Sequence, residues 1–225
     1  MVDTSMLSQH QLSTDSPPAN SLFWKLWNSN TETAEKALNT NFVQGIKDGT
    51  LDPVKYGGFN VSDAYYCFKG AEDYLTAANK ATNPTLKAFL MKKHNSYVSY
   101  NNTFPTTWHV KDGSSIVPSS VCASYSAFET EVVGNDDPIY ALIVMLPCEY
   151  LWAWLGAQLS PASNSNLYAP WITGNNYPQG AYAMGNFLVE YQKQNPIDED
   201  KAQEIYAQAM EYEYQNFAIA TDAGS

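Results

Sequence analysis

The sequence predicts an all-α fold, built as a single helical bundle of seven or more helices. Apolar residues recur at helical spacing along most of the chain, and no run of alternating β-branched residues indicates a strand. No internal repeat or long linker divides the chain. Its 225 residues, of which 44% are hydrophobic, are enough for one core of ordinary size.

The N-terminal residues are polar and rich in Ser, Thr and Gln, with Pro17-Pro18 near the end of this segment. They lack both the basic and the apolar region of a signal peptide. We therefore predict a flexible tail over residues 1–20 and the bundle domain over residues 21–225. Ser21 is a candidate cap for a first short helix.

Turn residues and prolines delimit the next helices. A second helix is expected from Thr31 to Ile46, because Asp48-Gly49 follows it. Pro53 suits the first turn of a long helix towards Ala81, and Pro84 opens another that reaches about Tyr100. The polar segment from Asn101 to Pro118 is predicted to be a loop.

The C-terminal half contains the most apolar stretch. Four helices are predicted there, over about residues 119–133, 138–159, 178–194 and 198–220, with a loop over 160–166. Residues 139–157 are apolar enough to raise the question of a membrane span. However, Glu149 and Pro147 lie at the centre of this stretch and no lysine flanks it, so the charge signal of a spanning helix is missing. We interpret it as a helix buried on all sides in the bundle.

The charge of the chain narrows the class of ligand. All 12 basic residues are lysine, against 23 acidic residues, and the formal net charge is −11. Arginine binds phosphate and carboxylate groups through its planar fork, so a chain without arginine is poorly equipped for nucleic acids or nucleotides. No lysine lies between Lys111 and Lys193. A site built from that segment is expected to have a negative potential, which favours a neutral or cationic ligand.

Neither a cofactor nor a metal is expected. The three histidines, His10, His94 and His109, form no Glu-x-x-His pair or carboxylate cluster of the kind that holds a di-iron centre, and none is a good haem ligand. Three cysteines without close spacing argue against a disulfide framework. We therefore predict a cytoplasmic protein.

Three polar residues in apolar surroundings are candidates for a site. Cys148 follows Pro147, which can open the apolar helix towards a cavity, although a lone cysteine can also be a small core residue. Glu213 lies in a stripe of small and apolar residues, as either a buried acid or part of a solvated face. Asp63 lies one turn before Tyr66, so the pair can reach one ligand or bond a neighbouring helix.

Four segments form a combination that is more specific than any one of them: NFVQGIKDGTL at 41–51, SDAYY at 62–66, ALIVMLPCEYLW at 141–152 and MEYEYQNF at 210–217. In order and spacing, over about residues 22–220, they resemble the TenA family of thiamin-metabolism enzymes, also called thiaminase II or aminopyrimidine aminohydrolases. The resemblance implies the all-helical fold that this family shares with haem oxygenase.

The resemblance also implies a role for each matched position. Cys148 would be the nucleophile and Glu213 the acid/base group. Asp63 would bind the aminopyrimidine, together with Tyr66 and, in the helix before the nucleophile, Tyr125.

Three positions depart from the family pattern. Tyr177 would be the last pocket tyrosine, but it follows Trp171-Ile172 only after an assumed short insertion. Trp152, expected to bind substrate, stands where members often have tyrosine. Asn216 stands where an aromatic residue is usual, so the pocket wall is expected to be altered.

The implied reaction is hydrolysis of the C–N bond at the methylene of a 4-amino-pyrimidine, to give hydroxymethyl-pyrimidine. The substrate would be aminomethyl-pyrimidine or thiamin, in thiamin salvage or degradation. The alternative is a catalytically silent aminopyrimidine- or thiamin-binding protein on the same scaffold. A homo-oligomer, often a tetramer, is also implied, with no nucleic acid or membrane partner. Because Cys148 lies in the lysine-free segment, no fixed cation is expected beside its thiol.

Overall fold

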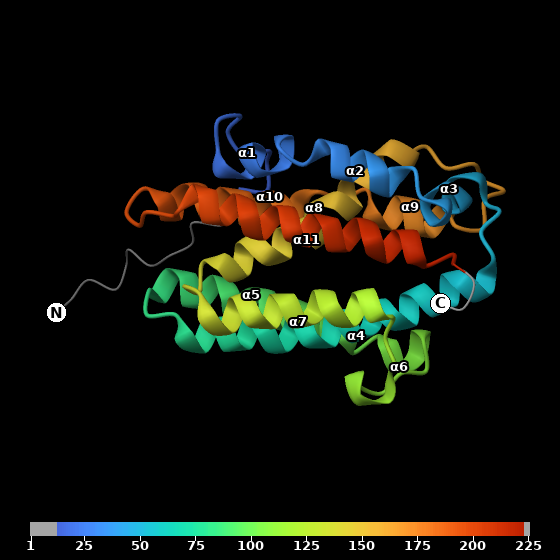
Figure 1. Cartoon of the computed structure of the whole chain (residues 1–225), viewed down its shortest axis with the longest axis horizontal. Helices are drawn as coiled ribbons and strands as arrows, with labels where there is room; N and C mark the ends of the chain where they lie inside the picture. Colours follow the sequence, from blue (N-terminus) through green and yellow to red (C-terminus); the bar gives the residue numbers. More distant parts are fainter. Residues whose placement is uncertain (1–12, 223–225) are drawn as a thin grey trace.

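The computed structural model describes residues 13–222, and every regular element in that range is helical (Figure 1). The all-α prediction is therefore confirmed. In chain order the elements are α1 (Leu22–Asn28), α2 (Thr31–Leu38), α3 (Asn41–Asp48), α4 (Pro53–Lys80), α5 (Pro84–Asn101), α6 (Phe104–Thr107), the 3₁₀ turn η2 (Gly113–Ser115), α7 (Ser120–Asn135), α8 (Tyr140–Leu159), α9 (Ala169–Asn175), α10 (Gln179–Gln192) and α11 (Glu199–Ile219).

The long helices run roughly along the long axis of the molecule (Figure 1). Helix α4 packs along α5 and α7, and these three form one side of the bundle. Helices α1, α2 and α10 lie on the other side. Between them, α11 contacts α8, α2 and α7, so α8 and α11 join the two sides.

Helix α8 is the central core helix. Its first seven residues, from Tyr140 to Leu146, are all buried, and the side chains come from every face of the helix. Of the helices in residues 13–222, α8 is the one long and apolar enough to cross a membrane, and 72% of its most apolar window is buried in the protein. Its burial agrees with the interpretation of this stretch as a core helix.

The predicted second helix is instead two helices, α2 and α3. Asn39 ends the first, and Thr40 caps the second by accepting a hydrogen bond from the Val43 backbone N–H at 3.4 Å. Short polar side chains such as Asn and Thr bond to nearby backbone and so favour helix ends over helix interiors. The helix is therefore interrupted at Asn39 and Thr40, although the apolar spacing continues past them.

Two other differences concern short helices. The predicted loop over 101–118 contains α6 and η2, and helix α9 was not predicted. Each is seven residues or shorter, which is too short for a periodic pattern to emerge.

Residues 13–20 of the predicted tail contact the bundle. The Trp24 indole N–H donates to the Pro17 carbonyl at 2.9 Å, and the Asn186 amide donates to the carbonyls of Ser13 and Asp15 at 2.8 Å. Residues 1–12 of that tail lie outside the described residues. The division into tail and bundle domain remains a prediction.

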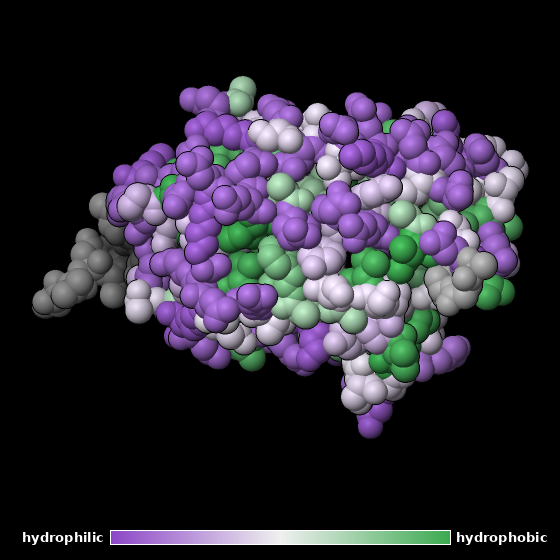
Figure 2. All heavy atoms as spheres, in the orientation of Figure 1, coloured by the Kyte–Doolittle hydropathy of each residue, from purple (hydrophilic) through white to green (hydrophobic). Residues whose placement is uncertain are grey.

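The face shown in Figure 2 is mostly hydrophilic, with hydrophobic side chains exposed along its middle and near α6. Single exposed apolar residues such as Val54 and Val117 are normal for a protein surface.

Gly156 on α8 sets how closely this helix approaches the end of α9. An added Cβ would lie 2.5 Å from the backbone nitrogen of Asn176 and 2.7 Å from the carbonyl carbon of Asn175. We expect Gly156→Ala to lower the free energy of unfolding by about 1–3 kcal/mol, because the backbone must move apart. Urea denaturation measures this change.

Gly134→Ala in α7 is the matched control, because nothing lies within 4 Å of the added Cβ. Removing a helical glycine there should leave stability unchanged or raise it by about 0.5–1 kcal/mol. Equal losses in both variants would contradict the close approach of α8 and α9.

Candidate active site

A cavity of about 440 Å³ opens between α4, α5, α8 and the segment from the end of α9 to the start of α10. Its volume is within the range of small-molecule sites. It is lined by Asp63, Cys67, Lys93, Ser96, Tyr97, Tyr100, Cys148, Glu149, Trp152, Ala153, Gly174, Asn175, Tyr177 and Gly180. Four of the seven predicted site residues therefore share one cavity: Asp63, Cys148, Trp152 and Tyr177.

Cys148 lies half-buried on α8, directly after the proline inside that helix. Pro147 has no N–H to donate to the carbonyl four residues earlier, which interrupts the helix hydrogen bonds at this point. Burial raises the pKa of the Cys148 thiol well above its usual value, and the negative charges of Glu213 and Asp63 raise it further. The thiol is therefore protonated at neutral pH unless a base takes its proton.

Asp63 reaches the cavity from α4. Burial raises the pKa of its carboxyl to about 7, although its side chain keeps some exposure through the cavity. Its partner is the Cys67 thiol one turn later, with Sγ 3.9 Å from Oδ2, which is a weak contact. An amine ligand that donates to Asp63 would supply the strong partner that the carboxyl lacks.

Glu213 lies behind the cavity wall on α11. Its side chain is 3% exposed, so the alternative of a solvated helix face is wrong. The Trp152 indole N–H donates to Glu213 Oε2 at 3.1 Å. Burial raises the pKa of Glu213 to about 8, and the bond from Trp152 opposes that rise. Trp152 thus lines the cavity and holds the acid/base candidate in place.

Aromatic rings extend this wall. The Trp152 ring lies 5.9 Å from Phe59, 5.4 Å from Phe217 and 5.6 Å from Trp171, measured between centroids. Tyr177 is 67% exposed, which places its side chain at the mouth of the cavity.

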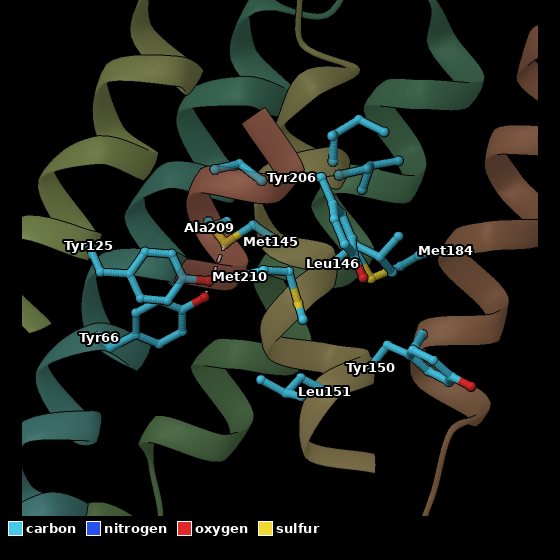
Figure 3. Packing of buried hydrophobic residues seen from close by; sticks show 14 of the residues in the cluster. Tyr66, Tyr125, Met145, Leu146, Tyr150, Leu151, Met184, Tyr206, Ala209 and Met210 are labelled. Carbon is cyan, nitrogen blue, oxygen red and sulfur yellow. Dashed lines mark hydrogen bonds between the residues drawn. The ribbon is translucent and has the colours of Figure 1, made fainter. Parts of the chain in front are cut away.

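Tyr66 and Tyr125 lie behind the cavity rather than in its lining. Their ring centroids are 5.0 Å apart, and both hydroxyl groups point towards Met145 (Figure 3). The Tyr66 hydroxyl donates to Glu129 Oε1 at 2.7 Å. Glu129 is not among the residues predicted from the sequence, although its position one helical turn after Tyr125 places both residues on the same face.

One cation lies in the lining of the cavity, where it is paired with a carboxylate. Helix α5 brings Lys93 into the cavity lining, where it forms an ion pair with Glu149, the residue after Cys148. Lys93 lies outside the lysine-free segment, and its place became clear only from the packing of α5. The opposite charges of Lys93 and Glu149 cancel, so this edge of the cavity has no net charge.

Asn216 belongs to a different cavity, of about 600 Å³, where it lies beside Phe59 and Ser119. Its Oδ1 accepts from the Ser119 hydroxyl at 3.5 Å. The expectation that Asn216 alters the wall of the Cys148 cavity is therefore wrong. In residues 13–222 no group of three or more His, Cys, Asp or Glu side chains could hold a metal ion.

Comparisons with known proteins agree on the fold. No protein-family profile matches the chain. A TenA homologue from P. horikoshii OT3 superposes with a TM-score of 0.76 at 17% identity, over 89% of this chain and 98% of that one. A TenA family transcription regulator from Silicibacter sp. TM1040 gives 0.77 at 16% identity, over 90% and 97%. The chain has the fold of TenA proteins. The resemblance seen in its sequence therefore extends to its structure.

Two further relatives of this TenA-like chain are named for thiamin chemistry. A Sulfolobus solfataricus P2 structure, whose name proposes a TenA-like thiaminase, gives a TM-score of 0.68 at 15% identity, over 87% of this chain and 93% of that one. The thiamine biosynthesis multifunctional protein ThiED of Corynebacterium efficiens is 21% identical over 215 residues. That match covers 92% of this chain, which spans 29% of the length of ThiED.

The buried carboxyls make a prediction about stability. Glu213 and Asp63 have folded pKa values of about 8 and about 7, above the ordinary values of 4.5 and 3.8. At a pH between the unfolded and the folded pKa of a carboxyl group, the folded protein still holds a proton that the unfolded chain has released. The free energy of unfolding must therefore fall as pH rises from about 4 to 8.

Glu213→Gln should remove much of this slope and stabilise the protein at pH 8.5 by about 1–3 kcal/mol, because the amide is neutral and can still accept from Trp152. Denaturation curves at several pH values test this. Glu211→Gln, on the same helix but partly exposed, is the control and should keep the slope of the unmodified protein. A Glu213→Gln slope that matches this control would contradict the raised pKa.

Proposed function

We propose that the chain is a TenA-like hydrolase of thiamin metabolism. It cleaves the C–N bond at the methylene of a 4-amino-pyrimidine, in aminomethyl-pyrimidine or thiamin, and releases hydroxymethyl-pyrimidine. Its role would be thiamin salvage or degradation. The names of the TenA-like thiaminase and of ThiED support the thiamin-related part of this proposal.

The observation that carries the proposal is the meeting of a thiol and two acidic groups from three helices. Cys148 of α8 and Asp63 of α4 line one cavity, and Glu213 of α11 is hydrogen-bonded to the Trp152 ring that walls it. Hydrolysis at this methylene needs a nucleophile, a group that moves a proton and an anchor for the ring amine. These three residues supply one of each.

In the proposed reaction the Cys148 thiol passes its proton to the Glu213 carboxylate as sulfur forms a bond to a ring carbon of the pyrimidine. The C–N bond then breaks. The amine that departs from aminomethyl-pyrimidine takes a proton from Glu213, whereas the thiazolium of thiamin departs as a neutral thiazole and needs none. Water adds at the methylene, the proton that it releases passes to the Cys148 sulfur, and the thiol leaves the ring. Asp63 accepts from the ring amine throughout, while Trp152 and Tyr177 bound the space for the ring. One water is consumed and one amine is released.

The second candidate is a silent binding protein for an aminopyrimidine or thiamin. Two observations favour it. The raised pKa keeps the Cys148 thiol protonated, and the ion pair with Glu149 neutralises the charge of Lys93, the cation in the cavity lining. Thermal stabilisation by ligand without product would indicate this candidate.

A nucleic-acid function does not fit this chain, although one structural relative is named as a transcription regulator. The chain has no arginine and a net charge of −11, so it lacks the basic surface that binds phosphate backbones. The absence of a cofactor, the cytoplasmic location and assembly as a homo-oligomer, such as a tetramer, remain predictions.

Product analysis by chromatography and mass spectrometry tests the proposed function. The protein is incubated separately with aminomethyl-pyrimidine and with thiamin, and hydroxymethyl-pyrimidine is quantified. We expect product from at least one substrate and none from Cys148→Ser, because serine is a far weaker nucleophile at neutral pH.

Cys122→Ser is the matched control. Cys122 is a buried cysteine outside the cavity, and a hydroxyl can replace its contact with the Ser62 carbonyl. It should retain activity. Full activity in Cys148→Ser would contradict the nucleophile assignment, and no product from the unmodified protein would leave the binding candidate.

A further inference from the structure

The cavity of about 600 Å³ that contains Asn216 shares no lining residue with the Cys148 cavity. It lies at one end of the bundle, between the N-terminal part of α4, the start of α7 and the end of α11 (Figure 1). Apolar side chains such as Phe59, Val61 and Ile219 form part of its wall. Its volume is within the range of small-molecule sites.

The charge of this wall is unusual for so acidic a chain. Within residues 13–222, none of the lining residues is Asp or Glu, although the chain has 23 acidic residues against 12 lysines. One lining residue, Lys55, is basic. The Cys148 cavity, in contrast, is lined by Asp63 and Glu149. An anionic ligand would therefore meet no repelling carboxylate in the wall of the larger cavity.

Asn216 on α11 presents a hydrogen-bond donor to this cavity. Its side chain is 7% exposed, and its Oδ1 accepts from the Ser119 hydroxyl at 3.5 Å. The Ser119 oxygen itself accepts from the Cys122 backbone N–H at 3.1 Å, so its hydrogen is available for the amide oxygen. The Asn216 amide nitrogen is left without a partner among the described residues. It is positioned to donate to an acceptor on a ligand.

The start of α7 supplies further donors to the cavity, which Ser119 and Ser120 line. The Ser119 N–H is taken by the Ser62 hydroxyl at 3.0 Å. The Ser120 N–H has no partner in the part of the chain that the structure describes, as is usual at the first position of a helix. Because α7 is 16 residues long, its dipole places about half a positive charge at this end. The start of α7 therefore favours an anion.

Two glycines of α4 leave space in the cavity. Gly57 and Gly58 line it, and nothing lies within 4 Å of a Cβ added at either position. Glycine inside a helix costs about 0.5–1 kcal/mol relative to alanine. The packing of the bundle does not require glycine at these positions, whereas a molecule held in the cavity would use the space that they leave.

We propose that this cavity is a second small-molecule site, which binds an organic monocarboxylate with an apolar body. The carboxylate accepts from the Asn216 amide and from the Ser120 N–H. The apolar body packs against Phe59 and Ile219. A phosphate dianion fits less well, because the chain has no arginine and the helix dipole supplies only about half a charge. The site does not depend on the proposed function, since it uses no residue of the Cys148 cavity.

Titration of ¹⁵N-labelled, ligand-free protein with sodium benzoate and with sodium hexanoate, followed by NMR, tests the proposal. With at least one acid, the Asn216 side-chain amide and the Ser120 N–H should shift and saturate, beyond any shift caused by sodium chloride at the same ionic strength. The neutral amide of the acid that binds, benzamide or hexanamide, should bind at least about tenfold more weakly, because it lacks the charge that these donors favour.

Gly57→Leu tests whether the ligand occupies the cavity. The leucine side chain enters open space, so it should fill the cavity without straining the fold and weaken binding at least about tenfold. Gly134→Leu in α7 is the matched control, because its Cβ also meets nothing within 4 Å and Gly134 lies outside this cavity. It should bind as the unmodified protein does.

Asn216→Asp tests the donor. Aspartate keeps an oxygen that can accept from Ser119 but replaces the amide N–H groups with an anionic oxygen, so binding should again weaken at least about tenfold. If this variant does not fold, as judged by circular dichroism, the comparison of Gly57→Leu with Gly134→Leu decides the proposal.

Three results would overturn the second site. The first is the absence of saturable shifts at Asn216 and Ser120 with both acids. The second is equal affinity for the acid and its neutral amide. The third is a Gly57→Leu variant that binds as tightly as Gly134→Leu. None of these results bears on hydrolysis of an aminopyrimidine, which is measured separately by its product.

Discussion

The burial of acidic groups in a chain without arginine is the constraint on which the candidate site depends. Asp63, Asp73, Glu129 and Glu213 all lie in or beside the core, and burial is the main cause of the raised pKa of each. A buried carboxylate without a cation is costly, so these groups keep protons to an unusually high pH or accept strong hydrogen bonds. The bonds from Trp152, Thr130 and Tyr66 are of this second kind.

This constraint explains the chemistry available in the cavity. The Cys148 thiol cannot rely on a neighbouring cation for ionisation, since Lys93 is paired with Glu149. In the proposed reaction it depends instead on a carboxyl group whose pKa is near that of a working base, and Glu213, at about 8, is such a group. Under this proposal, the burial that costs folding free energy also gives Glu213 a pKa suited to proton transfer near neutral pH. The same environment favours a substrate that carries an amine.

The sequence allowed the fold class to be predicted, and it singled out Cys148, Asp63 and Glu213, which the structure places in or beside one cavity. Cys148 follows a proline in an apolar helix, Glu213 lies in an apolar stripe, and the ordered motifs resemble one family. Lys93 and Glu129 had no such signal, since their importance comes from contacts between helices that are distant in the chain.

The break between α2 and α3 was missed because two capping residues, Asn39 and Thr40, outweighed the apolar pattern. Asn216 was assigned to the wrong cavity for a related reason, because its contact with Ser119 at the start of α7 joins segments that are distant in the chain.

The titration of individual carboxyl groups, followed by NMR of protein labelled with ¹³C at the Asp and Glu side chains, tests the central claim most directly. The account predicts that the resonances of Asp63, Asp73 and Glu213 titrate about two pH units or more above the ordinary carboxyl range, and that Glu129 also titrates above that range. Assignment by Asp→Asn and Glu→Gln variants identifies each resonance. If all four groups titrated near pH 4, the acids would be ionised in the native core, and the account of this site would be contradicted.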